Sequence, residues 1–498
     1  MAFQAYYFSE EHELFRSGLR SFLDKEVHPF IDQWEEERQI PKALWKKFGD
    51  QGYLGLNYAE QWGGSEGDFF FSVVFLEEIA KCFSGGFTIT PTVQQYMASP
   101  YISKHGSDFL KEKYLRKAIN GESICAIAIS EPGAGSDVAN IQTKAIRNGD
   151  HYIVNGAKTF ITNAYYGDFL IAVVKTEPEK GIDGTSLLVI DRAATGVSAS
   201  KLKKLGWHAS DTAELHFDEV KVPVENLIGE EGKGFYYLMG GLQLERLAGA
   251  ICAVSACEHM LEYTLQYMSE REAFGRPINK FQVLRHRMAQ LASEITSTKA
   301  FVYQCARMHA DKIYAVKECS MAKLLATELS DKVATQCLQS FGGYGYMEEF
   351  KIARMFRDSR IGTIGGGTSE IMREIIAKMM IDDKNYHAAS TPVLQSSENE
   401  DPFITIFHIL EEKGAKAKPL GNKLNFNFSG QTIHVDGTGT KNRVLQQNQE
   451  ADCTIAVSTQ DFMDILKGKL NPMNAMMGGK IQIEGDLSVA MKLQSLLN

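Results

Sequence analysis

Residues 235–257 read FYYLMGGLQLERLAGAICAVSAC, a long apolar run in which the only charged residues are Glu245 and Arg246. At a helical period of about 100° per residue, one narrow stripe contains Leu238, Leu242, Glu245, Gly249, Cys252 and Ala256. A carboxylate on the packed face of a helix is costly unless it is paired or its pKa is raised. A raised pKa is also what a general base needs near neutral pH. The pattern leaves two interpretations of Glu245 open, a structural ion pair and a catalytic base.

The composition narrows the class of protein. The chain has 498 residues, 44% hydrophobic and 23% charged, which is typical of a globular protein with two to four domains. A membrane span is a third interpretation of residues 235–257, but its two adjacent charges, its Gln and its two Tyr argue against it. The formal net charge is −9 and there is no Lys/Arg-rich block, so we expect no nucleic-acid partner.

The cysteines and the N-terminus bear on the compartment. The eight cysteines are scattered and form no C-x-x-C pair, which predicts a reducing compartment, no disulfide framework and no metal site. The first residues, MAFQAYYFSEEHELF, are acidic and lack the basic and apolar regions of a signal or transit peptide. We therefore expect a cytoplasmic protein.

Changes in pattern along the chain predict five segments. They are a helical N-terminal domain (1–122), a middle β domain (123–229), a helical bundle (230–385), a polar, Ser-rich linker (386–401) and a small C-terminal α/β unit (402–498). The first helix is expected to begin at Ser9 as N-cap, with His12 three residues later. In the last segment, Leu424, Phe426 and Phe428 alternate with Asn as in a half-buried strand, and short helices are expected over 460–467, 472–477 and 487–497.

Several glycine-rich loops follow strands or open helices. They read IAISEPGAGS (127–136), QSFGGYGY (339–346) and GGGTSE (365–370), with Thr368 as an expected N-cap. REAFG (271–275) is expected to end a helix with Gly275 as its C-cap, and Arg271 is placed where it can pair with a pyrophosphate. Most loops of this kind are simple turns. Neither G-x-G-x-x-G nor G-x-x-x-x-G-K-[ST] is present, which argues against dinucleotide-fold and P-loop proteins.

Taken in order, these loops resemble the acyl-CoA dehydrogenase family. The matching pieces are AISEPGAGSD (128–137), FITN (160–163), FDEVKVPVENLIG (217–229), REAFGRPINKFQ (271–282), QSFGGYGY (339–346), RMFRDSR (354–360) and GGTSEIMREIIAK (366–378). The resemblance implies a helical domain, a β domain and a four-helix bundle, with FAD bound between subunits. It also implies that a base removes the α-proton of an acyl-CoA while a hydride leaves the β-carbon for the flavin, giving a trans-2-enoyl-CoA.

The resemblance also bears on the base. Many members carry a catalytic Glu just before G-T-S, where this chain has Gly366. Members similar to isovaleryl-CoA and long-chain acyl-CoA dehydrogenases instead use the Glu of an L-E-R-L stretch, which here is Glu245 in residues 244–247. The missing side chain at Gly366 would leave room for Glu245, so the resemblance favours Glu245 as the catalytic base.

The resemblance assigns the remaining roles by position. The acyl-CoA site would contain Ser136, Gln243, Arg246 and Gly366, and the backbone N–H near Gly366 would stabilise the developing enolate. The FAD site would contain Ile127, Ile129, Ser130, Gly135, Ser136, Phe160, Ile161, Thr162, Arg271, Phe274, Gln282, Gln339, Gly342, Gly343, Thr368 and Glu370. Since Arg271, Gln282 and 339–343 would reach the flavin of a neighbouring subunit, we expect a dimer or tetramer.

The last segment resembles a sterol carrier protein domain. The pieces are ADCTIAV (451–457), GKLNP (468–472), GKIQIEG (479–485) and LSVAMKL (487–493). This resemblance implies a sheet covered by helices around an apolar tunnel for fatty acyl chains, acyl-CoA or sterols. Our leading hypothesis is a fatty acyl-CoA dehydrogenase that passes electrons to an electron-transfer flavoprotein. A flavin-dependent acyl-CoA oxidase and a non-catalytic lipid-binding protein are the alternatives, and the acyl length stays open.

Overall fold

The computed structural model describes residues 6–382, 402–416, 419–428, 430–466, 475, 480–486 and 489. Contacts divide the chain into two compact units, Met1–Ser390 and Thr391–Asn498, and each is described by itself. The predicted linker at 386–401 and the predicted helices at 472–477 and 487–497 fall wholly or mostly outside the described residues.

The first unit begins with short helices that pack around a common core. They are α1 Glu10–Glu26, α2 Ile31–Glu37, α3 Lys42–Asp50, α4 Phe69–Ile79, α5 Gly85–Thr92, α6 Ser99–His105, α7 Asp108–Leu110 and α8 Arg116–Ile119. As predicted, Ser9 caps α1: its hydroxyl accepts the backbone N–H of His12, whose ring accepts the backbone N–H of Ser9. The α4 helix begins after the glycine-rich break, with Asp68 as its cap, and nearly all of its residues are buried.

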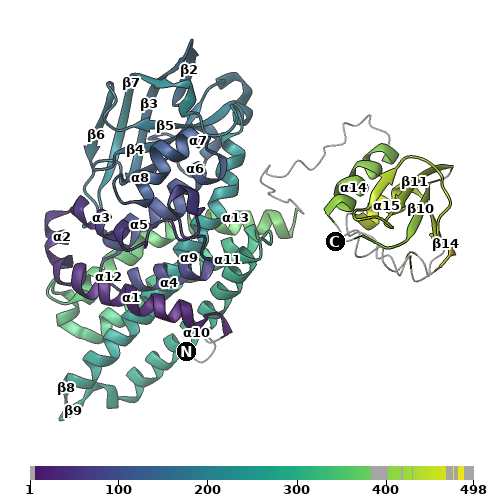
Figure 1. Ribbon diagram of the computed structural model, residues 1–498. Coiled ribbons are helices and arrows are strands. Elements are labelled where there is room, and N and C mark those ends of the chain that lie inside the picture. The colour runs from purple at the N-terminus through teal and green to yellow at the C-terminus, as the bar shows by residue number, and fades with distance from the viewer. Residues whose placement is uncertain are drawn as a thin grey trace. The chain divides into compact units, whose positions relative to one another are not determined.

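A seven-stranded sheet follows. Its strands are β1 Cys125–Ala128, β2 Lys144–Asn148, β3 His151–Thr162, β4 Phe169–Lys175, β5 Thr185–Asp191, β6 Val197–Lys201 and β7 Thr212–Pro223. The order is β1-β4-β2-β3-β7-β6, and β5 pairs with β4. The β3–β7 register shifts between Lys158 and Ile161, next to the predicted flavin loop. Figure 1 shows this sheet above helices α1–α5, in blue and teal.

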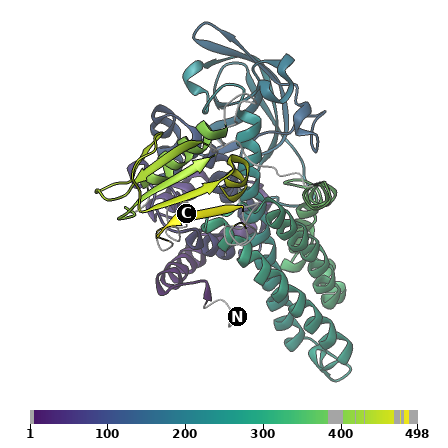
Figure 2. The same ribbon diagram turned by 90° about the vertical axis from the view of Figure 1, so that its right-hand side faces the viewer.

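Long helices complete the first unit. They are α9 Gly234–Glu270, α10 Gln282–Ala310, α11 Val316–Phe341, α12 Lys351–Ser359 and α13 Ser369–Met380. The α9 helix contacts α4, α10 and α11, and it extends with α10 toward a small hairpin, β8 Glu272–Ala273 and β9 Arg276–Pro277 (Figures 1 and 2). Thr368 caps α13, as predicted, by accepting the backbone N–H of Ile371.

One feature of this region extends the sequence pattern, and another contradicts a prediction. The α9 helix packs on more than the stripe that contains Glu245, because residues 244–248 are all buried where α4, α10 and α11 surround the helix. Gly275 does not cap a helix: α9 ends at Glu270, and Phe274 and Gly275 form the turn of the β8–β9 hairpin with φ of 52° and 75°. A two-residue hairpin turn requires positive φ, as a helix C-cap does, so the same glycine suits both structures.

The second unit has its own sheet and core. Its elements are α14 Pro402–Lys416, β10 Lys423–Phe428, β11 Gln431–Asp436, β12 Arg443–Leu445, β13 Cys453–Val457, α15 Thr459–Leu466 and β14 Ile481–Gly485, with sheet order β12-β11-β10-β13-β14. Leu424, Phe426 and Phe428 are buried, as predicted. Asn425 is buried too, contrary to simple alternation, because it hydrogen-bonds His434, Asn448 and Gln449.

Candidate active site

Glu245 lies inside the first unit and accepts a hydrogen bond from another helix. It is 8% exposed, and Tyr101 of α6 donates its hydroxyl proton to Glu245 Oε1 at 2.9 Å. Burial raises the pKa of Glu245 to about 7, while the Tyr101 hydrogen bond and the positive charge of Arg246 act in the opposite direction. At neutral pH this carboxyl can therefore both accept and release a proton, which is what a general base requires.

A glycine turn is tied to the helix that faces Arg246. Lys323 of α11 is 4% exposed and donates to the carbonyl oxygen of Gly367 at 2.6 Å. Burial, and then the charge of Arg246, lower the pKa of Lys323 to about 8. Gly366 has φ of +64° and no neighbouring atom within 4 Å of the place where a Cβ would lie. Lys323 thus links the turn that contains Gly366 to the surroundings of Arg246.

The middle sheet holds two predicted flavin loops together. Lys158, fully buried, donates to the carbonyl of Ile129 at 2.9 Å and to Glu131 Oε1 at 2.8 Å. Glu131 also accepts the backbone N–H groups of Gln142 and Thr143. The backbone N–H of Thr159 donates to the carbonyl of Ser130. These bonds join the segment 127–136 to the segment 158–162.

The side chains that these loops present are accessible. Phe160 has φ of 62° and is 72% exposed, at the shift in the β3–β7 register. Gly135 and Ser136 are exposed, and Ile127, Ile129, Ser130 and Thr162 are half-buried, whereas Ile161 is buried in the sheet core. An exposed aromatic ring beside small residues and free backbone is a surface on which a flat ring system can lie.

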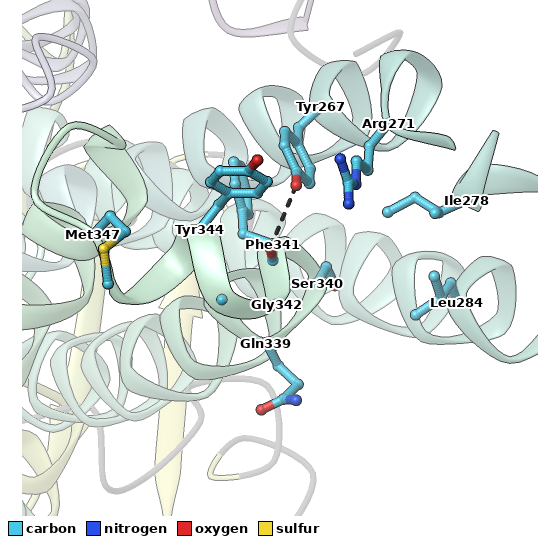
Figure 3. A pocket seen from close by; sticks show the side chains of 11 residues that line it. Tyr267, Arg271, Ile278, Leu284, Gln339, Ser340, Phe341, Gly342, Tyr344 and Met347 are labelled. Atoms are coloured by element: carbon cyan, nitrogen blue, oxygen red, sulfur yellow. Dashed lines mark hydrogen bonds between the residues drawn. The ribbon is translucent and has the colours of Figure 1, made fainter. Parts of the chain in front are cut away.

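A pocket of about 560 Å³ lies between the ends of α9 and α11 (Figure 3). Four predicted cofactor residues line it: Arg271, Gln339, Gly342 and Gly343. Neither Gly342 nor Gly343 has an atom within 4 Å of the place where a Cβ would lie. The guanidinium of Arg271 lies 5.4 Å from the centre of the Tyr344 ring. The pocket therefore offers one cation, an amide and unobstructed backbone, which fit a phosphate-containing group.

Four other predicted cofactor residues lie elsewhere in the first unit. Thr368 and Glu370 line a second pocket of about 470 Å³ together with Arg360, Thr363 and Ser369. Phe274 is 95% exposed in the turn of the hairpin, and Gln282 begins α10; neither lines the first pocket. In a single chain the predicted cofactor residues thus lie in several separate places. Among the described residues, no cluster of His, Cys, Asp or Glu could hold a metal ion.

Sequence reasoning missed Tyr101, Lys323 and the Lys158–Glu131 pair. Each of these residues lies in a segment of the chain far from the group it contacts. One signal was present for Tyr101: a Cβ at Gly241 would lie 2.2 Å from the Tyr101 hydroxyl oxygen, so the paired glycines of the L-M-G-G-L stretch indicate a close neighbour.

The chain is similar to known proteins along most of its length. Models of the acyl-CoA dehydrogenase N-terminal, middle and C-terminal domains match residues 9–122, 126–220 and 232–381, and the model of the SCP-2 sterol transfer family matches 406–498. The long-chain specific acyl-CoA dehydrogenase of Rattus norvegicus is 42% identical over 76% of this chain and 88% of its own. A subunit of the caffeyl-CoA reductase–Etf complex of Acetobacterium woodii is 35% identical over 75% of this chain and 99% of its own.

Solved structures agree with this relationship. The crystal structure of an acyl-CoA dehydrogenase from Geobacillus kaustophilus is 45% identical, with a TM-score of 0.74 over 75% of this chain and 99% of its own. In the part of the chain that the structure describes, no helix is long and apolar enough to cross a membrane. The chain is an enzyme of the acyl-CoA dehydrogenase family, followed by a C-terminal domain of the SCP-2 sterol transfer family.

Proposed function

We propose that this enzyme oxidises a fatty acyl-CoA to the trans-2-enoyl-CoA, with Glu245 removing the α-proton. The observation that carries the proposal is the buried carboxyl of Glu245, whose pKa is raised to about 7. Gly366, at the position where many relatives carry the base, cannot supply a carboxylate. A placed base of suitable strength typically contributes roughly 10²–10⁴-fold to the rate of proton transfer.

Residues around Glu245 would bind and orient the thioester. The backbone N–H of Gly366 would donate to the thioester carbonyl, and a fixed donor in a dry site stabilises developing negative charge effectively. Lys323 would hold that turn by its bond to the Gly367 carbonyl. Arg246 and Gln243, on α9 beside Glu245, would line the same site with Ser136 of the middle domain.

The residues present fit FAD, which accepts the hydride in this chemistry. Arg271, Gln339, Gly342 and Gly343, which line the first pocket, would bind the pyrophosphate of a neighbouring subunit's flavin, and Thr368 and Glu370 of the second pocket would contact the flavin of their own subunit. The segments around Ile127, Ile129, Ser130, Gly135 and Ser136, and around Phe160, Ile161 and Thr162, would contact its ring system. Phe274 and Gln282 would contact a neighbouring subunit's flavin. Because these places are separated on one protomer, we propose a dimer or tetramer.

The acyl chain would lie along α9 beyond the base. Gly249 is one turn after Glu245, and a Cβ there would meet no neighbouring atom within 4 Å. Cys252, one turn further, is half-buried. Room on this side of the helix favours a fatty acyl group. The SCP-2 domain would bind a lipid or acyl-CoA, since its family is named for sterol transfer.

We further propose an electron-transfer flavoprotein as the acceptor, because a relative is named as part of an Etf complex. Because the eight cysteines are scattered and form no C-x-x-C pair, a reducing compartment such as the cytoplasm is proposed.

A turnover screen tests the proposal. The purified holoenzyme is given acyl-CoAs from C4 to C18 with an artificial electron acceptor, and the enoyl-CoA is measured. We expect enoyl-CoA without matching release of peroxide in air. Stoichiometric peroxide would assign an oxidase instead, and a colourless protein without turnover would refute the enzymatic proposal.

A further inference from the structure

Tyr101 contacts Glu245 from another helix. It is 3% exposed, and its hydroxyl lies 2.9 Å from Glu245 Oε1 and 3.5 Å from the carbonyl oxygen of Leu238. Burial, together with the nearby carboxylate, raises the pKa of Tyr101 well above its usual range. The phenol therefore keeps its proton at every working pH and is the donor in the bond to Glu245.

Gly241 allows this contact. It lies one turn before Glu245 on α9, and a Cβ there would lie 2.2 Å from the Tyr101 oxygen. That distance is far inside van der Waals contact, so any side chain at position 241 must push the hydroxyl away. The α6 and α9 helices thus meet at a point where glycine is required and where a hydroxyl is held against the carboxyl.

Several other charged groups lie near α9. Arg246 on α9 also favours the ionised form of Glu245, and behind it lie Lys323 and Cys319 of α11. On α6, burial lowers the pKa of Lys104, which faces His105 and, on α10, His309. On α4, Glu77 and Glu78 are paired with Arg16 and, from α10, Lys299. Among the described residues, only Tyr101 is seen to hydrogen-bond Glu245.

We propose that Tyr101, held against α9 by Gly241, is a positioning residue that sets the proton affinity of Glu245 and thereby the lower pH limit of the enzyme. This rests on the proposed function of Glu245 as the base. The hydroxyl stabilises the ionised, proton-accepting form of the carboxyl by a charge-assisted hydrogen bond.

Only one proton changes place in this step. The α-proton of the substrate goes to Glu245, and Tyr101 keeps its own. Once Glu245 is neutral, the bond from Tyr101 weakens, and the Leu238 carbonyl at 3.5 Å is a second acceptor within reach. The hydroxyl therefore keeps the carboxyl ionised before the transfer and is not left unpaired afterwards.

The test is the pH dependence of kcat/KM in Tyr101→Phe holoenzyme. Hydrogen bonds to charged groups are strong enough to move a pKa by about one unit, so we expect the acidic limb to move up by about one pH unit. At pH values on the acidic limb, kcat/KM of the variant should then be about tenfold lower than that of wild type, whereas near pH 9 the two should be close. Tyr114→Phe is the matched control, because that buried hydroxyl contacts Asn226; it should leave the limb in place.

A second variant and a second measurement keep the inference testable if Tyr101→Phe does not fold. Gly241→Ala keeps the phenol but displaces it, and should move the limb in the same direction. Infrared difference spectra against Glu245→Gln follow the protonated carboxyl directly, and should show it titrating at higher pH in both variants. An unmoved limb and an unmoved infrared titration in either folded variant overturn the inference. Full turnover in Glu245→Gln would instead refute the proposed function.

Discussion

The ammonium of Lys158 lies 2.8 Å from Glu131 Oε1 and 2.9 Å from the carbonyl oxygen of Ile129, inside the middle sheet. Lys158 comes from β3, two residues before Phe160, and Glu131 follows β1 in the segment that contains Gly135 and Ser136. One buried ion pair thus fixes the spacing of two segments that are separate in the chain and that we propose to hold one flavin.

Replacing Lys158 by Met should weaken flavin binding. Removing one partner of a buried pair leaves an uncompensated charge, typically at a cost of about 3–5 kcal/mol, and frees the Ile129 carbonyl. We expect the Kd for FAD to rise at least about tenfold and the free energy of unfolding to fall. The measurement is FAD titration of apoprotein by fluorescence quenching.

Lys144→Met is the matched control for this prediction, since Lys144 is an exposed residue of the neighbouring β2 strand. If Lys158→Met bound FAD as tightly as the control, the pair would not position the loops.

Filling the space at Gly249 should shorten the preferred acyl chain. The position is one turn beyond Glu245, and no neighbouring atom would touch a Cβ there. In a series from Ala through Val to Leu, kcat/KM for C14–C18 acyl-CoAs should fall progressively, while C4–C6 substrates retain most of theirs. A constant ratio of long-chain to short-chain kcat/KM across the series would place the acyl chain elsewhere.

The Glu245 carboxyl should lower the free energy of unfolding at alkaline pH. Its pKa in the folded protein is about 7, above the unfolded value near 4.3. Between these values the folded state binds more protons, so the free energy of unfolding falls as pH rises and the loss is complete above pH 7. Glu245→Gln removes this loss and should be more stable than wild type at pH 8 by up to about 4 kcal/mol.

Thermal unfolding from pH 4 to pH 9 checks this prediction. The difference in Tm should vanish toward pH 4, where both side chains are neutral. Glu230→Gln, an exposed position, should show no such dependence. The opposite result would be a variant whose Tm, measured against that of wild type, is lower at pH 8 than at pH 4. That result would mean that the folded state stabilises the carboxylate.

The first unit should keep its dehydrogenase activity when the second unit is removed. Each has its own core, and contacts divide the chain at Ser390. A chain ending at Ser390 should keep its FAD and the full-length kcat, and should lose binding of a fluorescent fatty acid measured by displacement. A colourless truncated protein would show that the first unit needs the second.

Local chemistry made much of the fold predictable. The cap formed by Ser9 and His12, the cap at Thr368 and the position of Glu245 inside a long apolar helix follow from neighbours within one or two turns. Gly275 shows where local reasoning fails, because a helix end and a hairpin turn both need positive φ and only the tertiary path distinguishes them.

Long-range contacts were beyond such reasoning. Tyr101 meets Glu245 across 144 residues of sequence, and Lys323 meets Gly367 across 44. Periodicity placed Glu245 on a packed face, but it cannot name a partner from another helix. The family resemblance suggested which residues gather around the substrate, whereas the groups that hold those residues in place became visible only in three dimensions.

Anaerobic single turnover of the Glu245→Gln holoenzyme is the most direct test of the account. Wild-type enzyme mixed with a saturating acyl-CoA should lose its flavin absorbance near 450 nm rapidly. Glu245→Gln, with equal FAD content and unchanged acyl-CoA binding, should lose it at least about a hundredfold more slowly, because no base removes the α-proton. Flavin bleaching at the wild-type rate in this variant would contradict the assignment of Glu245 as the base.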